Sequence, residues 1–275
     1  MRYVMRMNRF TVCAAALCAL GIALPLVVRG QQQQSPIDAK ADAILKRMSE
    51  TLAKAKRVTF DSHAIADQLT PDGQKLQFAK NQKVRLQRPD KLSVDVTGDV
   101  EDLQFRYDGK RVTLYNPRTN SWGSAEMPPS IDDTLDTLAD KYGMALPLAD
   151  LVFADPYKSL GERVRSSEYL GDGWVFDAKC DHLAFRQAAI DWQIWVEQGD
   201  KPVPRKIVIT FKESPGHPQY TAFLSNWNLS ADVPQSTFAF TPPAGAKQVE
   251  FAPTTQPAAA AAPAPGNGTG GGSRK

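Results

Sequence analysis

Alternating apolar and polar residues predict a meander of short strands between Val84 and Trp122. Two stretches carry this period-two pattern, and their apolar members are Leu92, Val94, Val96, Leu103, Phe105 and Tyr107. Asp108-Gly109 follows them and is a signal for a tight hairpin, because glycine tolerates the positive φ that such a turn needs. A sheet of this kind exposes one face to solvent and must bury its other, apolar face against other parts of the protein.

Helical periodicity appears on both sides of this meander. Residues 39–56 place apolar side chains three and four positions apart, with Asp38 as a candidate N-cap. Ser130 can cap a second helix that begins at Ile131 and extends to Tyr142, and residues 146–153 predict a further short helix. These two predicted helices form an insert, residues 131–153, between two blocks of strands.

The remaining apolar runs predict strands. Before the meander they cover residues 58–69 and 74–87, with a turn at Pro71-Asp72-Gly73. After the insert they cover 164–170, 174–180, 190–197, 207–211, 220–229 and 238–240, and Gly171-Asp172-Gly173 predicts a hairpin turn between the first two. About eleven strands with few helices indicate the α+β class: a strongly curved antiparallel sheet, an open half-barrel, covered by an N-terminal helix and a helical lid.

Both ends of the chain differ from this domain in their amino-acid composition. Residues 1–30 combine Arg2, Arg6 and Arg9 with an apolar run from Phe10 to Val28, which is typical of a secretory signal peptide. The alternative is an uncleaved anchor in the inner membrane, because the run is about long enough to span a bilayer. Residues 31–36 form a polar leader, 37–251 the folded domain, and 252–275 an Ala/Pro/Gly-rich tail with nothing to bury, expected to be disordered.

Export also changes the charge and cysteine content of the 275-residue chain. Removal of residues 1–30 takes away four arginines and no acidic residue, which turns the formal charge from +3 to −1. A nearly neutral domain without a cluster of lysine and arginine lacks the electrostatic footprint of nucleic-acid binding. Of the three cysteines only Cys180 would remain, so no intramolecular disulfide can form. The hydrophobic core must therefore supply the stability.

Three short motifs carry a family resemblance. They are Arg88-Pro89-Asp90-Lys91-Leu92, the pair Tyr107-Asp108-Gly109-Lys110 with Leu114-Tyr115-Asn116-Pro117, and the run from Phe238 to Gly245, FAFTPPAG. In this order and spacing they resemble the LolA type of bacterial lipoprotein carrier, within the LolA/LolB-like superfamily. The second half, CDHLAFR from Cys180 and DWQIWVE from Asp191, is similar to a branch of predicted periplasmic proteins of unknown function in that superfamily.

The resemblance implies a curved antiparallel sheet around an apolar cavity with helices as its lid. It further implies a non-enzymatic periplasmic protein, without a cofactor, that binds or carries acyl chains of lipoproteins or other lipids. In the carriers the arginine of the Arg-Pro motif holds the lid shut, and the matching residue is Arg88, which a strand-end surface position would explain equally well. The candidate cavity and lid residues are Arg88, Leu92, Val94, Phe105, Leu135, Leu138, Leu148, Leu151, Phe153, Trp192 and Ile194.

Two other functions remain open. The same fold could serve as an envelope sensor or adaptor that binds a protein partner. Cys180 and His182, two residues apart on a predicted strand, point to the same face and could act as nucleophile and base or as metal ligands. No third orienting residue is evident from the spacing, and a packed thiol beside a hydrogen-bonded imidazole explains the pair as well. We expect a monomer with a lipid or lipoprotein ligand.

Overall fold

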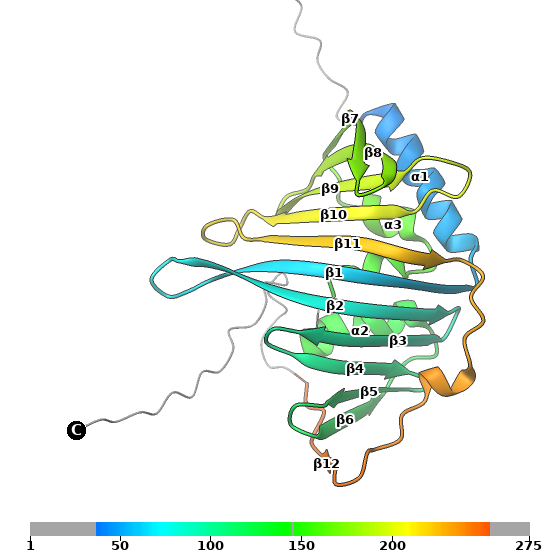
Figure 1. The fold of residues 1–275 in the computed structure, drawn as a ribbon, viewed down its shortest axis with the longest axis vertical. Helices are drawn as coiled ribbons and strands as arrows, with labels where there is room; N and C mark the ends of the chain where they lie inside the picture. Colours follow the sequence, from blue (N-terminus) through cyan, green and yellow to red (C-terminus); the bar gives the residue numbers. More distant parts are fainter. Residues whose placement is uncertain (1–36, 145, 254–275) are drawn as a thin grey trace, which may run out of the picture. The chain divides into compact units, whose positions relative to one another are not determined.

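The structure, a computed structural model, describes residues 37–144 and 146–253. Within these residues twelve strands form one sheet in the order β12-β6-β5-β4-β3-β2-β1-β11-β10-β9-β8-β7 (Figure 1). Every pair of neighbours is antiparallel except β12 and β6. The sheet is open, with β12 and β7 at its edges, which confirms the expected α+β class. The predicted signal peptide, the polar leader and residues 254–275 of the predicted tail lie outside the described residues.

The strands follow the chain in two blocks. Their bounds are β1 Arg57–Leu69, β2 Lys75–Gln87, β3 Lys91–Gly98, β4 Asp102–Tyr107, β5 Arg111–Asn116, β6 Ser121–Glu126, β7 Ser166–Val175, β8 Ala178–Arg186, β9 Ile190–Glu197, β10 Pro204–Phe211, β11 Gln219–Asn228 and β12 Lys247–Gln248. The helices are α1 Ala39–Lys54, α2 Ile131–Tyr142 and α3 Pro156–Gly161, with 3₁₀ turns η1 Ala149–Leu151 and η2 Gln235–Phe238. No helix in these stretches is long and apolar enough to cross a membrane.

Side-chain caps explain where the two longer helices begin. Asp38 accepts hydrogen bonds from the backbone N–H groups of Lys40 and Ala41, both at 2.8 Å, so it satisfies two donors that helix α1 leaves unpaired. Ser130 Oγ accepts from the N–H of Asp133 at 3.1 Å at the start of α2. Helix α2 ends at Gly143, whose φ of 66° is the left-handed conformation that glycine adopts most readily. Both predicted helix starts are confirmed.

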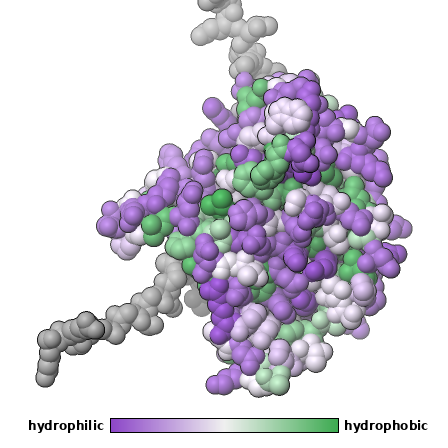
Figure 2. All heavy atoms as spheres, in the orientation of Figure 1, coloured by the Kyte–Doolittle hydropathy of each residue, from purple (hydrophilic) through white to green (hydrophobic). Residues whose placement is uncertain are grey.

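The two faces of the sheet differ because side chains alternate along each strand. Strands β1 and β2 pair without interruption from Arg57 opposite Gln87 to Leu69 opposite Lys75, and this register aligns their apolar positions. In Figure 1 helices α2 and α3 lie behind the strands, on the side where the apolar side chains gather. The opposite face, turned to the viewer in Figure 2, is mostly hydrophilic with scattered hydrophobic residues. A ligand site for apolar molecules is therefore expected on the helix side.

The core lies between the sheet and the helices. Helix α1 packs on β7, β8, β9 and α3, and its buried stripe consists of Ala41, Ile44, Leu45, Met48 and Leu52. Helix α2 buries Ile131, Leu135 and Leu138 against the same cluster. Burial of such side chains supplies the main favourable free energy of folding, because apolar surface is removed from water. The insert is thus part of the core as well as a cover.

Two local predictions are wrong, and a third is met only in part. Gly171-Asp172-Gly173 is not a hairpin turn: β7 passes through it with an irregular register at Gly171, and the turn lies at Phe176 and Asp177. Residues 238–240 hold the end of η2 instead of a strand, and the helix predicted for residues 146–153 is shorter than expected, the 3₁₀ turn η1. In addition, strands β6 and β12 and helix α3 were not predicted. Glycine in a sequence indicates that the backbone can adopt a positive φ. A β-bulge within a strand can use this conformation as well as a hairpin turn, so the glycines alone did not distinguish the two.

Candidate functional site

An apolar cavity of about 380 Å³ lies between the sheet and the insert. The sheet contributes apolar side chains from β1 to β4, namely Phe60, Ala66, Val84, Leu92, Val94, Val96, Leu103 and Phe105. The insert contributes Leu135, Met144, Leu146, Pro147, Leu148 and Val152. This volume falls within the range of about 300–1,000 Å³ that small-molecule sites occupy. The protein's own side chains therefore leave this cavity unfilled.

Few polar groups border this cavity, and they are paired. Lys80 Nζ lies 2.9 Å from Glu101 Oε1, so the two charges at the border neutralise each other. The hydroxyl of Tyr220 is 3.4 Å from Gln82 Oε1, and burial raises the pKa of this tyrosine well above its usual range. The phenol stays protonated at every physiological pH. A ligand in this cavity would therefore make mainly dispersion contacts and would meet little net charge.

Arg88 forms a hydrogen bond with the segment that lines the cavity opposite the sheet. Its Nη1 donates to the carbonyl oxygen of Val152 at 2.6 Å, while Nε and Nη2 have no hydrogen-bond partner. Burial lowers the pKa of the guanidinium, and the nearby carboxylate of Asp132 acts in the opposite direction. Asp132 itself accepts from the N–H of Ala154 at 3.0 and 3.1 Å. Two polar contacts thus attach residues 152–154 to the sheet and to α2.

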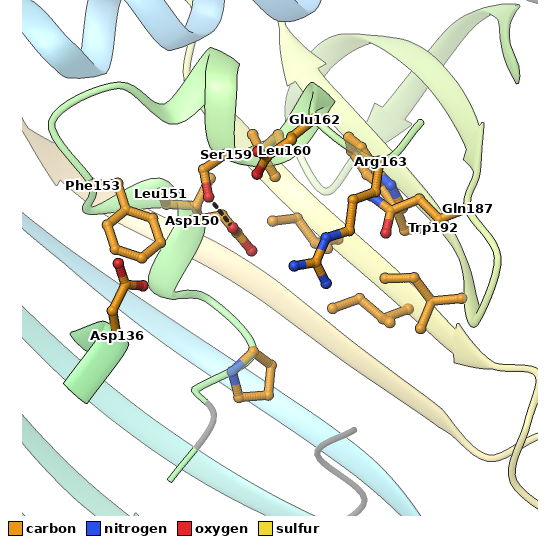
Figure 3. Close-up of a pocket in the computed structure, with 14 residues that line it drawn as sticks. Asp136, Asp150, Leu151, Phe153, Ser159, Leu160, Glu162, Arg163, Gln187 and Trp192 are labelled. Atoms are coloured by element: carbon orange, nitrogen blue, oxygen red, sulfur yellow. Dashed lines mark hydrogen bonds between the residues drawn. The ribbon is translucent and has the colours of Figure 1, made fainter. Parts of the chain in front are cut away.

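The sequence-derived candidates divide between two cavities and the core. Leu92, Val94, Phe105, Leu135 and Leu148 line the apolar cavity. Leu151, Phe153 and Trp192 line a second cavity of about 340 Å³, shown in Figure 3, which shares Pro147 with the first. Leu138 and Ile194 line neither of the two cavities and are both 0% exposed in the core.

Several lining residues were missed although a signal for them exists. Phe60, Val84 and Leu103 belong to the same period-two register as Leu92, so they follow from strand pairing. Met144 and Leu146 follow the C-terminal end of α2 and carry no periodic signal. Only their position in the folded chain brings them to the cavity.

Cys180 and His182 lie on the other face of the sheet. Cys180 is 0% exposed and packs with Val175 and Ala178, and burial raises the pKa of its thiol to about 11. His182 stacks on Trp195 with ring centroids 3.9 Å apart and shares a 3.0 Å hydrogen bond with Gln193 Oε1. Burial lowers the pKa of the imidazole. Across the described residues no three His, Cys, Asp or Glu side chains are grouped to hold a metal ion. In this arrangement the thiol is packed among apolar side chains, and the imidazole is stacked and hydrogen-bonded.

These features define a class: an open antiparallel sheet whose helical insert encloses an apolar cavity. Residues 41–252 match the model of the family described as predicted periplasmic protein, DUF2092, and the chain belongs to this family. The predicted branch of periplasmic proteins of unknown function is thereby confirmed. None of the curated proteins matches the chain.

Solved structures with a similar fold come from distant proteins. One is an uncharacterized conserved protein from Thermus thermophilus, with 12% identity, a TM-score of 0.44, and coverage of 77% of this chain and 99% of that one. The lipoprotein LppX of Mycobacterium tuberculosis has 13% identity, a TM-score of 0.45, and coverage of 72% and 100%. A LolA superfamily protein from Nitrosomonas europaea has 13% identity, a TM-score of 0.35, and coverage of 73% and 97%. Likenesses of this size carry no argument about the ligand.

Proposed function

We propose that this protein is a periplasmic binding or carrier protein for the acyl chains of lipoproteins or other hydrophobic envelope ligands, and that it works without catalysis. The observation that supports this proposal is the apolar cavity of about 380 Å³ between the sheet and the insert. An alkyl chain placed there exchanges water for methyl and methylene contacts, which is the main favourable term for such a ligand.

The insert would act as the cover of this cavity. Residues 146–153 contain only the short turn η1, and their polar attachments are the hydrogen bonds from Arg88 to Val152 and between Asp132 and Ala154. Opening of this segment would break these hydrogen bonds and expose Leu151 and Val152, which are buried in the core, while the buried stripe of α2 stays in place. Opening would admit the ligand, and closing would remove it from water.

The test combines native mass spectrometry with a cavity-filling variant. Gently purified protein should carry a lipid-sized mass or should bind a fluorescent fatty-acid analogue. Val94→Trp places an indole into the cavity and should weaken binding of the analogue about tenfold or more, because added volume in a packed site forces clashes. The matched control is Ile65→Trp, which adds the same side chain to the hydrophilic face of the sheet, beside the cavity-lining Ala66.

Three results would contradict the proposal. The first is wild-type protein that is purified without bound lipid and does not bind the fluorescent analogue. The second is Val94→Trp that binds the analogue as tightly as the wild type. The third is an equal loss of binding in both variants, because this would trace the effect to unfolding instead of to the cavity.

A further inference from the structure

The second cavity differs in character from the apolar one. It shares Pro147 with the first cavity, and the apolar side chains of Ile190, Ile207 and Ile209 from β9 and β10 form a part of its lining that we call its floor. Its walls carry polar side chains beside the apolar Leu151, Phe153 and Leu160, and Figure 3 shows the polar side chains divided. Arg163, Gln187 and Trp192 stand on one side, whereas Asp136 and Asp150 stand on the other.

The first wall carries hydrogen-bond donors that lack partners. Trp192 is 4% exposed, yet its indole N–H has no hydrogen-bond acceptor. Across the described residues no carboxylate lies within ion-pair distance of Arg163, and the side-chain amide of Gln187 makes no hydrogen bond. Buried N–H groups are nearly always paired, so an unpaired one at a cavity wall favours an acceptor in that cavity. The guanidinium of Arg163 points into the same space in Figure 3.

The opposite wall limits what this acceptor can be. Asp150 accepts a hydrogen bond from Ser159, and Asp136 has a raised pKa because it is partly buried and faces Asp140, Asp132, Asp133 and Asp150. Glu162 also lines the cavity. These acids disfavour a second anionic group in the same space. The walls therefore match a ligand with one anionic group, held beside Arg163.

We propose that the second cavity binds the single anionic end group, a carboxylate or a phosphate, of an amphiphile whose alkyl chain runs over the apolar floor and past Pro147 into the apolar cavity of the proposed function. This inference rests on the proposed function and deepens it, because it names the chemistry of the ligand's polar end. Arg163 supplies the charge, and the N–H groups of Trp192 and Gln187 supply hydrogen bonds. A hydrogen bond between ionised partners is stronger than one between neutral groups, so the end group sets selectivity among ligands of equal chain length.

The experiment compares palmitate with hexadecanol, which share an alkyl chain length and differ in charge. Dissociation constants are measured by displacement of a fluorescent fatty-acid analogue. The wild type should prefer palmitate about tenfold, and Arg163→Gln should remove most of this preference because palmitate binding weakens more than hexadecanol binding. Arg163→Lys keeps the charge and should retain part of the preference. Arg165→Gln, which neutralises an exposed arginine outside the cavity lining, is the matched control and should behave as the wild type.

Inorganic phosphate and acetate form a separate arm of the experiment. Neither should displace the analogue at millimolar concentration, because the alkyl chain contributes most of the binding free energy. Displacement by these ions alone would identify a site for free anions and overturn the proposal. Equal affinity for palmitate and hexadecanol, or a preference that survives Arg163→Gln, would overturn it as well and leave the proposed function intact. If neither ligand binds the wild type, the proposed function itself fails.

Discussion

Cys180 and His182 illustrate how the surrounding side chains determine the protonation state and reactivity of a residue. Both side chains project from the same face of β8, but Cys180 is enclosed by apolar neighbours and His182 is stacked on Trp195. The thiol is therefore protonated at neutral pH, with a pKa raised to about 11. A nucleophilic cysteine needs the opposite shift, because the thiolate is the reactive form. Burial makes this residue a small apolar side chain in a cluster with Val175 and Ala178, on the face of the sheet opposite the helices.

The raised pKa of Cys180 predicts a loss of stability at alkaline pH. The folded state holds the thiol proton up to about pH 11, whereas an exposed thiol with a pKa of 9.0 loses it earlier. The contribution is fully present below pH 9 and disappears as the pH rises through 11. Because each tenfold change in acidity equals about 1.4 kcal/mol, the free energy of unfolding should fall by about 3 kcal/mol through this group.

Urea unfolding between pH 8 and pH 11 measures this loss, with Cys180→Ala as the reference. Tyrosines that titrate in the same range affect both proteins alike, so the difference between them reports Cys180. If the free energy of unfolding depends on pH in the same way in both proteins, the thiol does not have the raised pKa that this prediction assumes.

At the scale of elements, the insert 131–153 joins two kinds of structure. Helix α2 is a capped, amphipathic helix whose apolar stripe is fixed in the core. Among the described residues between Gly143 and Phe153, η1 is the one helical turn. Arg88 and Asp132 form hydrogen bonds with Val152 and Ala154, and Leu151 and Val152 are buried in the core. Opening of this segment is therefore expected to cost these hydrogen bonds and this buried apolar area.

Arg88→Met should loosen this cover and leave the sheet intact. Methionine keeps much of the apolar stem but cannot donate to the Val152 carbonyl. A hydrogen bond to a charged group contributes about 1.5–3 kcal/mol, so amides in residues 146–154 should exchange with solvent about tenfold faster. Hydrogen exchange followed by mass spectrometry measures this rate.

Arg85→Met is the control for this experiment, because Arg85 lies on the opposite face of β2 and pairs with Asp95 at 2.8 Å. It should leave exchange in the insert unchanged. Equal exchange in wild type and Arg88→Met would exclude a holding role for Arg88.

At the scale of the whole domain, the C-terminal segment ties the insert to the edge of the sheet. After β11, in the middle of the sheet order, the chain reaches the far edge and adds β12 parallel to β6 (Figure 1). Phe251 then packs edge-on against Tyr142 of α2, with ring centroids 4.8 Å apart. A substituent on Gly123 would come within 3.5 Å of the Phe251 side chain. The C-terminal segment therefore packs against helix α2 and helps to hold it in place.

Phe251→Ala should lower the free energy of unfolding by about 1–2 kcal/mol, because it removes an aromatic pair and partly buried apolar area. Val249→Ala removes apolar atoms from the same segment at a position that is 51% exposed, and its effect should stay within about 0.5 kcal/mol. Urea denaturation measures both. A loss in Phe251→Ala no larger than in Val249→Ala would mean that the segment does not brace α2.

The sequence by itself determined the elements that depend on local pattern. Period-two alternation identified the paired strands around Leu92 and Phe105, and the caps at Asp38 and Ser130 identified two helix starts, because both signals act between near neighbours in the chain. The motif resemblance further led to the family and to Arg88. Only the tertiary structure decided that β7 continues through Gly171 and that Cys180 is buried on the face opposite the cavity. It also decided that Arg163, Gln187 and Trp192, from separate segments, share one cavity wall, since burial and long-range proximity arise only when distant segments pack.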